Sequence, residues 1–287
     1  MDNQAGPQII AHSPVPPHPH THTVIFLHGR GDTTNGFTRF LYNWHDSYGR
    51  TLFQTFPTFR WVFPQAPLRP VANAAAGVPR GMYQWFDVWN VQDFAEREEV
   101  QLEGLRETVP FVRELIRLEA EQLGGRWDRV VLAGISMGAA TSVHTLFNLE
   151  VPAEGGGRLA AFMGFCARCP FAGRGLRGMR EVLALGEGWP TGDESEVLRR
   201  TPMLLEHCTD DPLVKVGKGR GLRDTLREFG AQVEWKEYPS GGHWFTEPEG
   251  IDDVVQFLNR ALGNAGPMAV TAGAQTGRAG QDAMEMS

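Results

Sequence analysis

The 287-residue sequence has three cysteines and no apolar run long enough to cross a membrane. A membrane-spanning helix needs roughly 18 or more consecutive apolar residues, and three cysteines are too few for a disulfide framework in a chain of this length. The first residues also lack the basic start and apolar stretch of a signal peptide. We therefore expect a cytoplasmic protein with no stable insertion into a membrane.

Positive charge is scarce as well. The sequence has 27 lysines and arginines against 34 acidic residues, which gives a formal net charge of -7. A negative balance repels phosphate backbones, and no basic cluster offsets it. We therefore expect no nucleic-acid partner.

Composition divides the chain into three parts. Residues 1–21 are rich in Pro and His, which predicts a flexible N-terminal lead-in. Residues 264–287 are rich in Gly, Ala, Thr and Gln without periodicity, which predicts a disordered tail. One folded domain over residues 22–263 is expected between them.

Within this domain, short apolar runs alternate with helical patterns. The runs are rich in Val, Leu and Phe on both faces, as expected of parallel strands covered by helices. We expect strands at Thr23–Leu27, Arg60–Phe63, Arg129–Ala133, Leu159–Phe165, Pro202–Glu206 and Gln232–Glu237. Apolar residues at three- or four-residue steps predict helices over 98–123, 217–229 and 251–262, the first of them kinked at Pro110. The order predicts a doubly wound, mostly parallel α/β sheet.

The strongest chemical signal is Gly134-Ile135-Ser136-Met137-Gly138. An expected strand runs straight into it, and a small-residue stretch follows as a helix start. A sharp strand-to-helix turn needs glycines beside the serine, and it raises the hydroxyl at the carboxyl edge of the sheet. This pattern predicts the nucleophile of an α/β-hydrolase at Ser136, in a single domain with a small cap or none.

A serine nucleophile needs a base, and in this fold the base follows the serine and the acid along the chain. Three histidines follow Ser136. His144 lies in the helix after the turn, and His207 closes a strand, so we expect structural roles for both. His243 lies in a glycine-containing loop between the last strand and the last helix, which is typical of the histidine of a catalytic triad.

The acid is expected in the loop after the preceding strand, where Asp210 and Asp211 stand side by side. Spacing alone does not choose between them. Two backbone N–H groups should stabilise the oxyanion. We expect one from Met137, which follows the nucleophile, and the other from Arg30, in the glycine-containing loop after the first expected strand.

Several strings appear in the order typical of one family. They are Phe26-Leu27-His28-Gly29-Arg30-Gly31-Asp32, Phe63-Pro64-Gln65-Ala66-Pro67, Trp85-Phe86-Asp87, Gly134–Gly138, Asp211-Pro212-Leu213-Val214 and Gly242-His243. Together they resemble the phospholipase/carboxylesterase family that includes the acyl-protein thioesterases, over about residues 23–262.

The resemblance implies that Asp211 is the acid, and it supports Ser136, His243 and the Arg30 and Met137 amides. It implies a serine hydrolase that forms an acyl-enzyme, needs no metal or organic cofactor, and cleaves small esters or acylated proteins. We expect a monomer or homodimer.

Some features depart from the family. Arg30 stands where those thioesterases usually have Leu, and Met137 where they have Gln. The Arg30 side chain either places a positive charge near the pocket or lies in solvent. Residues 166–200 also differ, and that region tends to shape the acyl channel.

Trp85, Phe86 and Trp244 are candidates for the lining of the substrate cleft, although Trp85 and Phe86 could equally pack a loop over the sheet. Two alternative functions remain open. One is hydrolysis or acyl transfer on a small specialised ester or lactone, and the other is a binding protein that has lost catalysis.

Two further groups could suggest metal binding. Cys166 and Cys169 form a C-x-x-C pair, but no second pair completes a zinc site. His18, His20 and His22 alternate, but a polar tract beside a strand explains them as well. We expect no metal at either place.

Overall fold

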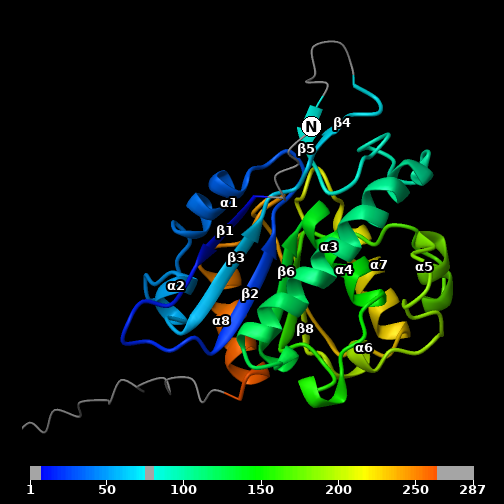
Figure 1. Cartoon of the computed structure of the whole chain (residues 1–287). Coiled ribbons are helices and arrows are strands. Elements are labelled where there is room, and N and C mark those ends of the chain that lie inside the picture. The colour runs from blue at the N-terminus through cyan, green and yellow to red at the C-terminus, as the bar shows by residue number, and fades with distance from the viewer. Residues whose placement is uncertain (1–7, 75–80, 264–287) are drawn as a thin grey trace, which may run out of the picture.

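A seven-stranded sheet forms the centre of the protein (Figure 1). The structure is a computed structural model that describes residues 8–74 and 81–263, so the expected tail lies outside the described residues. The sheet order is β1-β3-β2-β6-β7-β8-β9. The strands are β1 (Ile9–His12), β2 (His22–Leu27), β3 (Phe59–Pro64), β6 (Val130–Ile135), β7 (Ala161–Phe165), β8 (Met203–Cys208) and β9 (Val233–Tyr238). All neighbours are parallel except β1 and β3.

All six predicted strands are confirmed, with ends that move by one or two residues. The seventh, β1, was not predicted, and it pairs antiparallel with β3 in a register that sets Ile10 opposite Phe63. The expectation of a flexible lead-in is therefore wrong for residues 9–12. The sequence signal is weak there because β1 is an edge strand of four residues that leaves Ile9 exposed.

Helices cover both faces of the sheet (Figure 1). One face carries α3 (Gln101–Gln122), α4 (Met137–Phe147), α5 (Leu176–Leu183), α6 (Glu196–Arg200) and α7 (Val216–Glu228). The other carries α1 (Thr34–Leu41), α2 (Leu52–Thr55) and α8 (Glu249–Ala261). Strand side chains alternate between the two cores: Ile25 and Leu27 pack under the first group, and Val24 and Phe26 under the second.

The three predicted helices are confirmed as α3, α7 and α8, and α3 continues unbroken through Pro110. Short 3-10 turns occur at η1 (Glu98–Val100), η2 (Trp127–Arg129) and η3 (Ala153–Gly155). Of the helices in the described residues, none is both long and apolar enough to span a membrane.

A small antiparallel ribbon stands above the carboxyl edge of the sheet (Figure 1). It consists of β4 (Leu68–Pro70) and β5 (Gly81–Tyr83). The Gly31 amide donates to the Tyr83 carbonyl at 2.7 Å, which ties the ribbon to the loop after β2. The ribbon thus lies close to the sheet edge at which the catalytic residues are expected.

Candidate active site

Ser136 occupies a strained turn between β6 and α4. Its backbone has φ 55° and ψ -119°, a conformation that non-glycine residues rarely adopt. A Cβ at Gly134 would lie 2.5 Å from the Ala139 nitrogen, and one at Gly138 would lie 2.3 Å from the Leu27 carbonyl oxygen. Both positions therefore require glycine. The predicted pattern of glycines around a serine has a direct steric cause.

Asp211 and His243 are joined at the end of two neighbouring strands. Nδ1 of His243 lies 2.7 Å from Oδ2 of Asp211. The other Asp211 oxygen accepts hydrogen bonds from the amides of Leu213 and Val214, at 2.8 and 2.9 Å. Because Asp211 is 1% exposed, these bonds hold its carboxylate in one orientation.

The charge state of Asp211 follows from its contacts. Burial raises its pKa, but hydrogen bonds from His207, His243 and the Val214 amide outweigh burial and hold the pKa well below its usual range. Asp211 is therefore ionised at neutral pH. An ionised carboxylate only accepts, so Nδ1 of His243 carries the proton and Nε2 of the neutral ring is free to act as a base.

Asp210, the other candidate acid, has a different role. Its carboxylate accepts from the Gly242 amide at 2.8 Å and from the Gly241 amide at 3.3 Å. It therefore holds the loop that carries His243 and makes no contact with the imidazole ring. The structure brings Asp211, and not Asp210, to His243.

His207 and His144 have structural contacts, as expected. Nε2 of His207 lies 2.7 Å from the Val214 carbonyl oxygen and 3.3 Å from Oδ2 of Asp211. This buried ring therefore helps to hold the Asp211 carboxylate in position. That contact was not predicted. His144 is buried in α4, where burial lowers its pKa to about 4 and Nε2 contacts the Pro170 carbonyl. Neither ring lines the cavity that contains Ser136.

A cavity of about 330 Å³ contains both Ser136 and His243. Its walls come from the loop after β2, the ribbon, the segment before α3, the loops after β6, β7 and β8, and the loop before α8. The lining residues are Gly29, Arg30, Asp32, Met82, Val88, Val91, Phe94, Ile135, Ser136, Met137, Arg168, Leu213, Val214, His243 and Trp244. Trp244 lines the cavity, in agreement with its proposed place.

Trp85 and Phe86 do not line this cavity. Both are 0% exposed and belong to the core between the sheet and α3. Nε1 of Trp85 donates to the His28 carbonyl at 2.8 Å, so the ring supports the loop after β2 from the core side. Their assignment as cleft residues is wrong, because the sequence shows two aromatic side chains but not which side of the loop they take.

The two expected oxyanion donors lie close to Ser136. A Cβ built on Gly29 would be 3.6 Å from Cβ of Ser136, which places the loop after β2 beside the serine. In that turn Gly31 and Asp32 use their amides in backbone hydrogen bonds, whereas the Arg30 amide has no acceptor among the described residues. Met137 is the first residue of α4, so its amide has no partner within the helix.

The Arg30 side chain is anchored beside the cavity. Its Nε donates to Oε1 of Gln84 at 2.8 Å, and Gln84 in turn donates to the Pro70 carbonyl and to Asp87. Burial lowers the pKa of Arg30, and the Asp87 charge opposes that effect. Among the described residues, the guanidinium is therefore neither fully solvated nor paired with a carboxylate.

One group of possible metal ligands occurs in the described residues. The ligand atoms of Cys166, Asp211 and His243 lie within 4.8 Å of one another. Burial raises the pKa of the Cys166 thiol well above its usual value, and Sγ contacts the Trp244 carbonyl at 3.3 Å. Since the thiol is protonated and the other two groups bond each other, hydrogen bonding accounts for the cluster. Cys169 is separate and buried, in contact with the Pro170 carbonyl.

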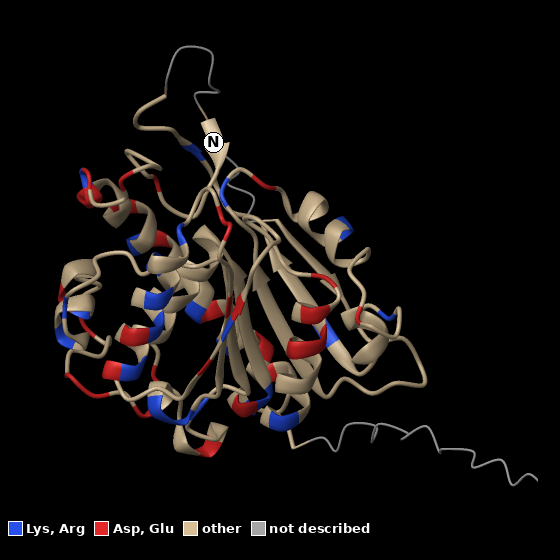
Figure 2. Cartoon of the chain, turned by 180° about the vertical axis from the view of Figure 1, so that it is seen from behind, with Lys and Arg blue, Asp and Glu red and all other residues tan. Residues whose placement is uncertain are grey.

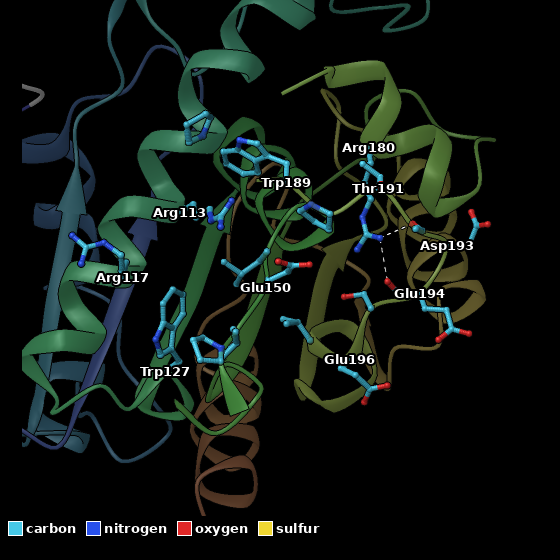
Figure 3. Close-up of a pocket in the computed structure, with 18 of the residues that line it drawn as sticks. Arg113, Arg117, Trp127, Glu150, Arg180, Trp189, Thr191, Asp193, Glu194 and Glu196 are labelled. Carbon is cyan, nitrogen blue, oxygen red and sulfur yellow. Dashed lines mark hydrogen bonds between the residues drawn. The ribbon is translucent and has the colours of Figure 1, made fainter. Parts of the chain in front are cut away.

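A larger groove of about 1190 Å³ lies elsewhere, between α3 and the segment around α5 and α6 (Figure 3). Two of its arginines are already engaged. Arg180 donates to backbone carbonyls of residues 192 and 194, and the Arg113 guanidinium lies 4.3 Å from the centre of the Trp189 ring. The groove contains none of the predicted catalytic residues, so size does not identify the active site here.

Comparisons with known proteins agree with this arrangement. The model of the Phospholipase/Carboxylesterase family matches residues 11–173. Acyl-protein thioesterase 1 of Gibberella zeae is 29% identical, over 85% of this chain and 92% of its own. The protein of the same name from Schizosaccharomyces pombe is 30% identical, over 68% and 70%.

Solved structures show the same fold. Acyl-protein thioesterase 2 of Zea mays superposes with a TM-score of 0.62 at 24% identity, over 89% of this chain and 99% of its own. SOBER1 of Arabidopsis thaliana gives 0.63 at 22% identity, over 84% and 99%. The α/β-hydrolase fold predicted from the sequence is confirmed.

Proposed function

The chain belongs to the phospholipase/carboxylesterase family, and from that premise we propose that it hydrolyses ester or thioester bonds through Ser136. One observation carries the assignment of residues. Ser136, in its strained turn, shares a cavity with His243, and His243 is bonded to the buried Asp211. Family membership supports a serine hydrolase, and this geometry supports these three residues as its triad.

The reaction would proceed in two steps. His243 Nε2 takes the proton from the Ser136 hydroxyl as Oγ bonds to the substrate's carbonyl carbon. The amides of Arg30 and Met137 donate to the oxyanion. The C–O or C–S bond then breaks, and His243 gives its proton to the leaving alcohol or thiol. Water hydrolyses the acyl-enzyme by the same sequence, while Asp211 stabilises the imidazolium in each step.

We propose only a broad substrate class, esters and thioesters. Apolar side chains such as Met82, Val88 and Leu213 line the cavity, which suits an acyl chain. The relatives' name suggests acylated proteins, and small esters fit the same chemistry. We also propose a cytoplasmic enzyme that acts as a monomer or homodimer. Acidic and basic residues are intermixed over the helices and loops (Figure 2), which supports the expectation of no nucleic-acid partner.

An assay with neutral substrates tests the proposal. The purified chain is supplied with 4-nitrophenyl esters and with acyl thioesters of increasing chain length, beside Ser136→Ala. We expect turnover of at least one series and a loss of nearly all of it in the variant, with the far-UV spectrum unchanged. A binding protein without catalysis would give no turnover in either form. Turnover retained in Ser136→Ala would overturn the assignment of the nucleophile.

A further inference from the structure

The wall of the cavity contains a buried cation, Arg168, which the proposed mechanism does not use. Arg168 lies in the loop after β7 and is 6% exposed, and it lines the cavity that contains Ser136. Its Nη2 donates to Oε1 of Gln101 at 2.8 Å. The guanidinium also lies 4.1 Å from the centre of the Phe94 ring. The side chain is therefore held in a fixed position by Phe94, in the segment before α3, and by Gln101, the first residue of α3.

Within the part of the chain that the structure describes, Arg168 has no carboxylate partner. Among the described residues, no acidic oxygen lies within 4.0 Å of its guanidinium. Glu98 acts on it from farther away, and one Glu98 oxygen accepts from the Phe171 amide. Burial lowers the pKa of Arg168 to about 10, so it stays charged at neutral pH. Proteins usually pair buried charges, because an uncompensated one is costly.

A second arginine, Arg30, lines the same cavity from another strand end. In the sheet, β6 lies between β2 and β7. Ser136 follows β6, Arg30 follows β2 and Arg168 follows β7, so the two cations enter from opposite sides of the nucleophile. Asp32, the one acidic residue that the described part of the chain contributes to the lining, accepts from the Thr33 amide. In a chain of net charge -7, the lining is cationic.

We propose that Arg168 binds a carboxylate carried by the substrate, so that the enzyme prefers esters or thioesters with an acidic group near the scissile carbonyl. This inference rests on the proposed hydrolase function and narrows its substrate class. The guanidinium offers several N–H donors, of which Gln101 occupies one, and a carboxylate matches the planar fork. Arg30, anchored by Gln84, adds attraction from the other side.

Two pairs of substrates test the proposal and locate the acidic group. Monomethyl glutarate against methyl pentanoate places a carboxylate in the acyl group. The second pair, 3-acetoxypropanoate against propyl acetate, places it in the leaving group. The readout is the ratio of kcat/KM for the charged and neutral members of each pair. We expect Arg168→Met to lower that ratio at least about tenfold in one pair, the range of a charge-assisted hydrogen bond.

Three controls make the result specific. Arg168→Lys should recover part of the ratio, since it keeps the charge and loses the fork. Arg113→Met removes an equal charge from the stacked arginine of the larger groove, and it should leave both substrates unaffected. The melting temperature of Arg168→Met should not fall by more than a few degrees, because a buried unpaired charge contributes little stability. If Arg168→Met does not fold, Arg168→Lys and Arg168→Gln carry the same test.

Other outcomes overturn the inference. Equal losses on charged and neutral substrates would mean that Arg168 only braces the segment before α3. An unchanged ratio in both pairs would mean that it does not contact the acidic group. The hydrolase proposal fails separately, if the wild-type protein turns over neither neutral ester and Ser136 takes no fluorophosphonate label.

Discussion

Two parts of the cavity are built in different ways. The proposed catalytic edge, which we define as Ser136, Asp211 and His243, is fixed by backbone geometry: a strained turn, amides that bond the acid, and a loop held by Asp210. The proposed substrate wall, which we define as Met82, Val88, Val91, Phe94 and Arg168, is fixed by side chains such as Arg168 stacked on Phe94. Backbone constraints suit chemistry that tolerates little displacement, whereas side-chain contacts can change without moving the strands. Variants of the edge should therefore abolish turnover, and variants of the wall should change selectivity.

The neighbouring aspartates give the largest expected difference. Asp211→Asn should lower kcat by about 10⁴-fold, because an amide in place of the carboxylate no longer fixes the His243 tautomer. Asp210→Asn keeps one oxygen for the loop amides and should cost roughly tenfold or less. Steady-state kinetics on one neutral ester measures both. The reverse ranking would mean that Asp210 is the acid.

Substitution of a glycine in the turn that carries Ser136 tests whether backbone geometry fixes the catalytic edge. Gly138→Ala places a Cβ 2.3 Å from the Leu27 carbonyl, so the loop after β2 must move relative to the serine. We expect a loss of kcat/KM of about 10²-fold and a lower melting temperature. Gly221→Ala in α7 is the matched control, because nothing lies within 4 Å of its Cβ. It should stabilise the protein by about 0.5–1 kcal/mol with turnover unchanged. Similar losses of kcat/KM in both variants would contradict the steric explanation.

Arg30 is relevant to both parts, since its amide is a proposed oxyanion donor and its side chain is anchored by Gln84. Arg30→Leu keeps the amide and removes the charge. We expect the preference in kcat/KM for acidic over neutral esters to weaken. The loss should correspond to about 1–3 kcal/mol of transition-state stabilisation, the value of one charge-assisted hydrogen bond. A proportional loss on both kinds of ester would instead show that the substitution displaced the oxyanion loop.

Glu206 is expected to affect stability alone. It is 4% exposed on β8, neither carboxyl oxygen has a hydrogen-bond partner among the described residues, and burial together with the Asp253 charge raises its pKa well above the usual value. A carboxyl group whose pKa is raised in the folded state stabilises the fold at pH values below the pKa of an unfolded glutamate. That contribution is lost as pH rises through the pKa of the folded state. Glu206→Gln should therefore be more stable than wild type by about 1–3 kcal/mol at pH 8, with a smaller difference at pH 5. Urea denaturation at both pH values measures this; a difference that does not grow with pH would contradict it.

Six strands and the proposed catalytic residues could be predicted from the sequence for physical reasons. Buried parallel strands are apolar on both faces, and the glycines around Ser136 are required by contacts of about 2.5 Å. His243 and Asp211 followed from chain order, although the choice of Asp211 over Asp210 needed the family resemblance.

The wall was not predictable in the same way. The position of the Arg168 side chain is fixed by a hydrogen bond to Gln101, 67 residues earlier in the chain. The residues that surround Arg168 in the sequence do not indicate that it is buried. The sequence could not decide whether Trp85 and Phe86 line the cleft or pack against the sheet, because residue type does not state direction. The short strands β1, β4 and β5 expose much of their length and give little apolar pattern. Such features depend on tertiary contacts, which local patterns do not contain.

The most direct test of the catalytic edge is the covalent labelling of one hydroxyl. A fluorophosphonate should add once per chain, and peptide mapping by mass spectrometry should place the adduct on Ser136. His243→Gln should slow labelling by orders of magnitude, since the hydroxyl loses its base, and Ser136→Ala should abolish it. An adduct on another residue, or rapid labelling without His243, would contradict the account.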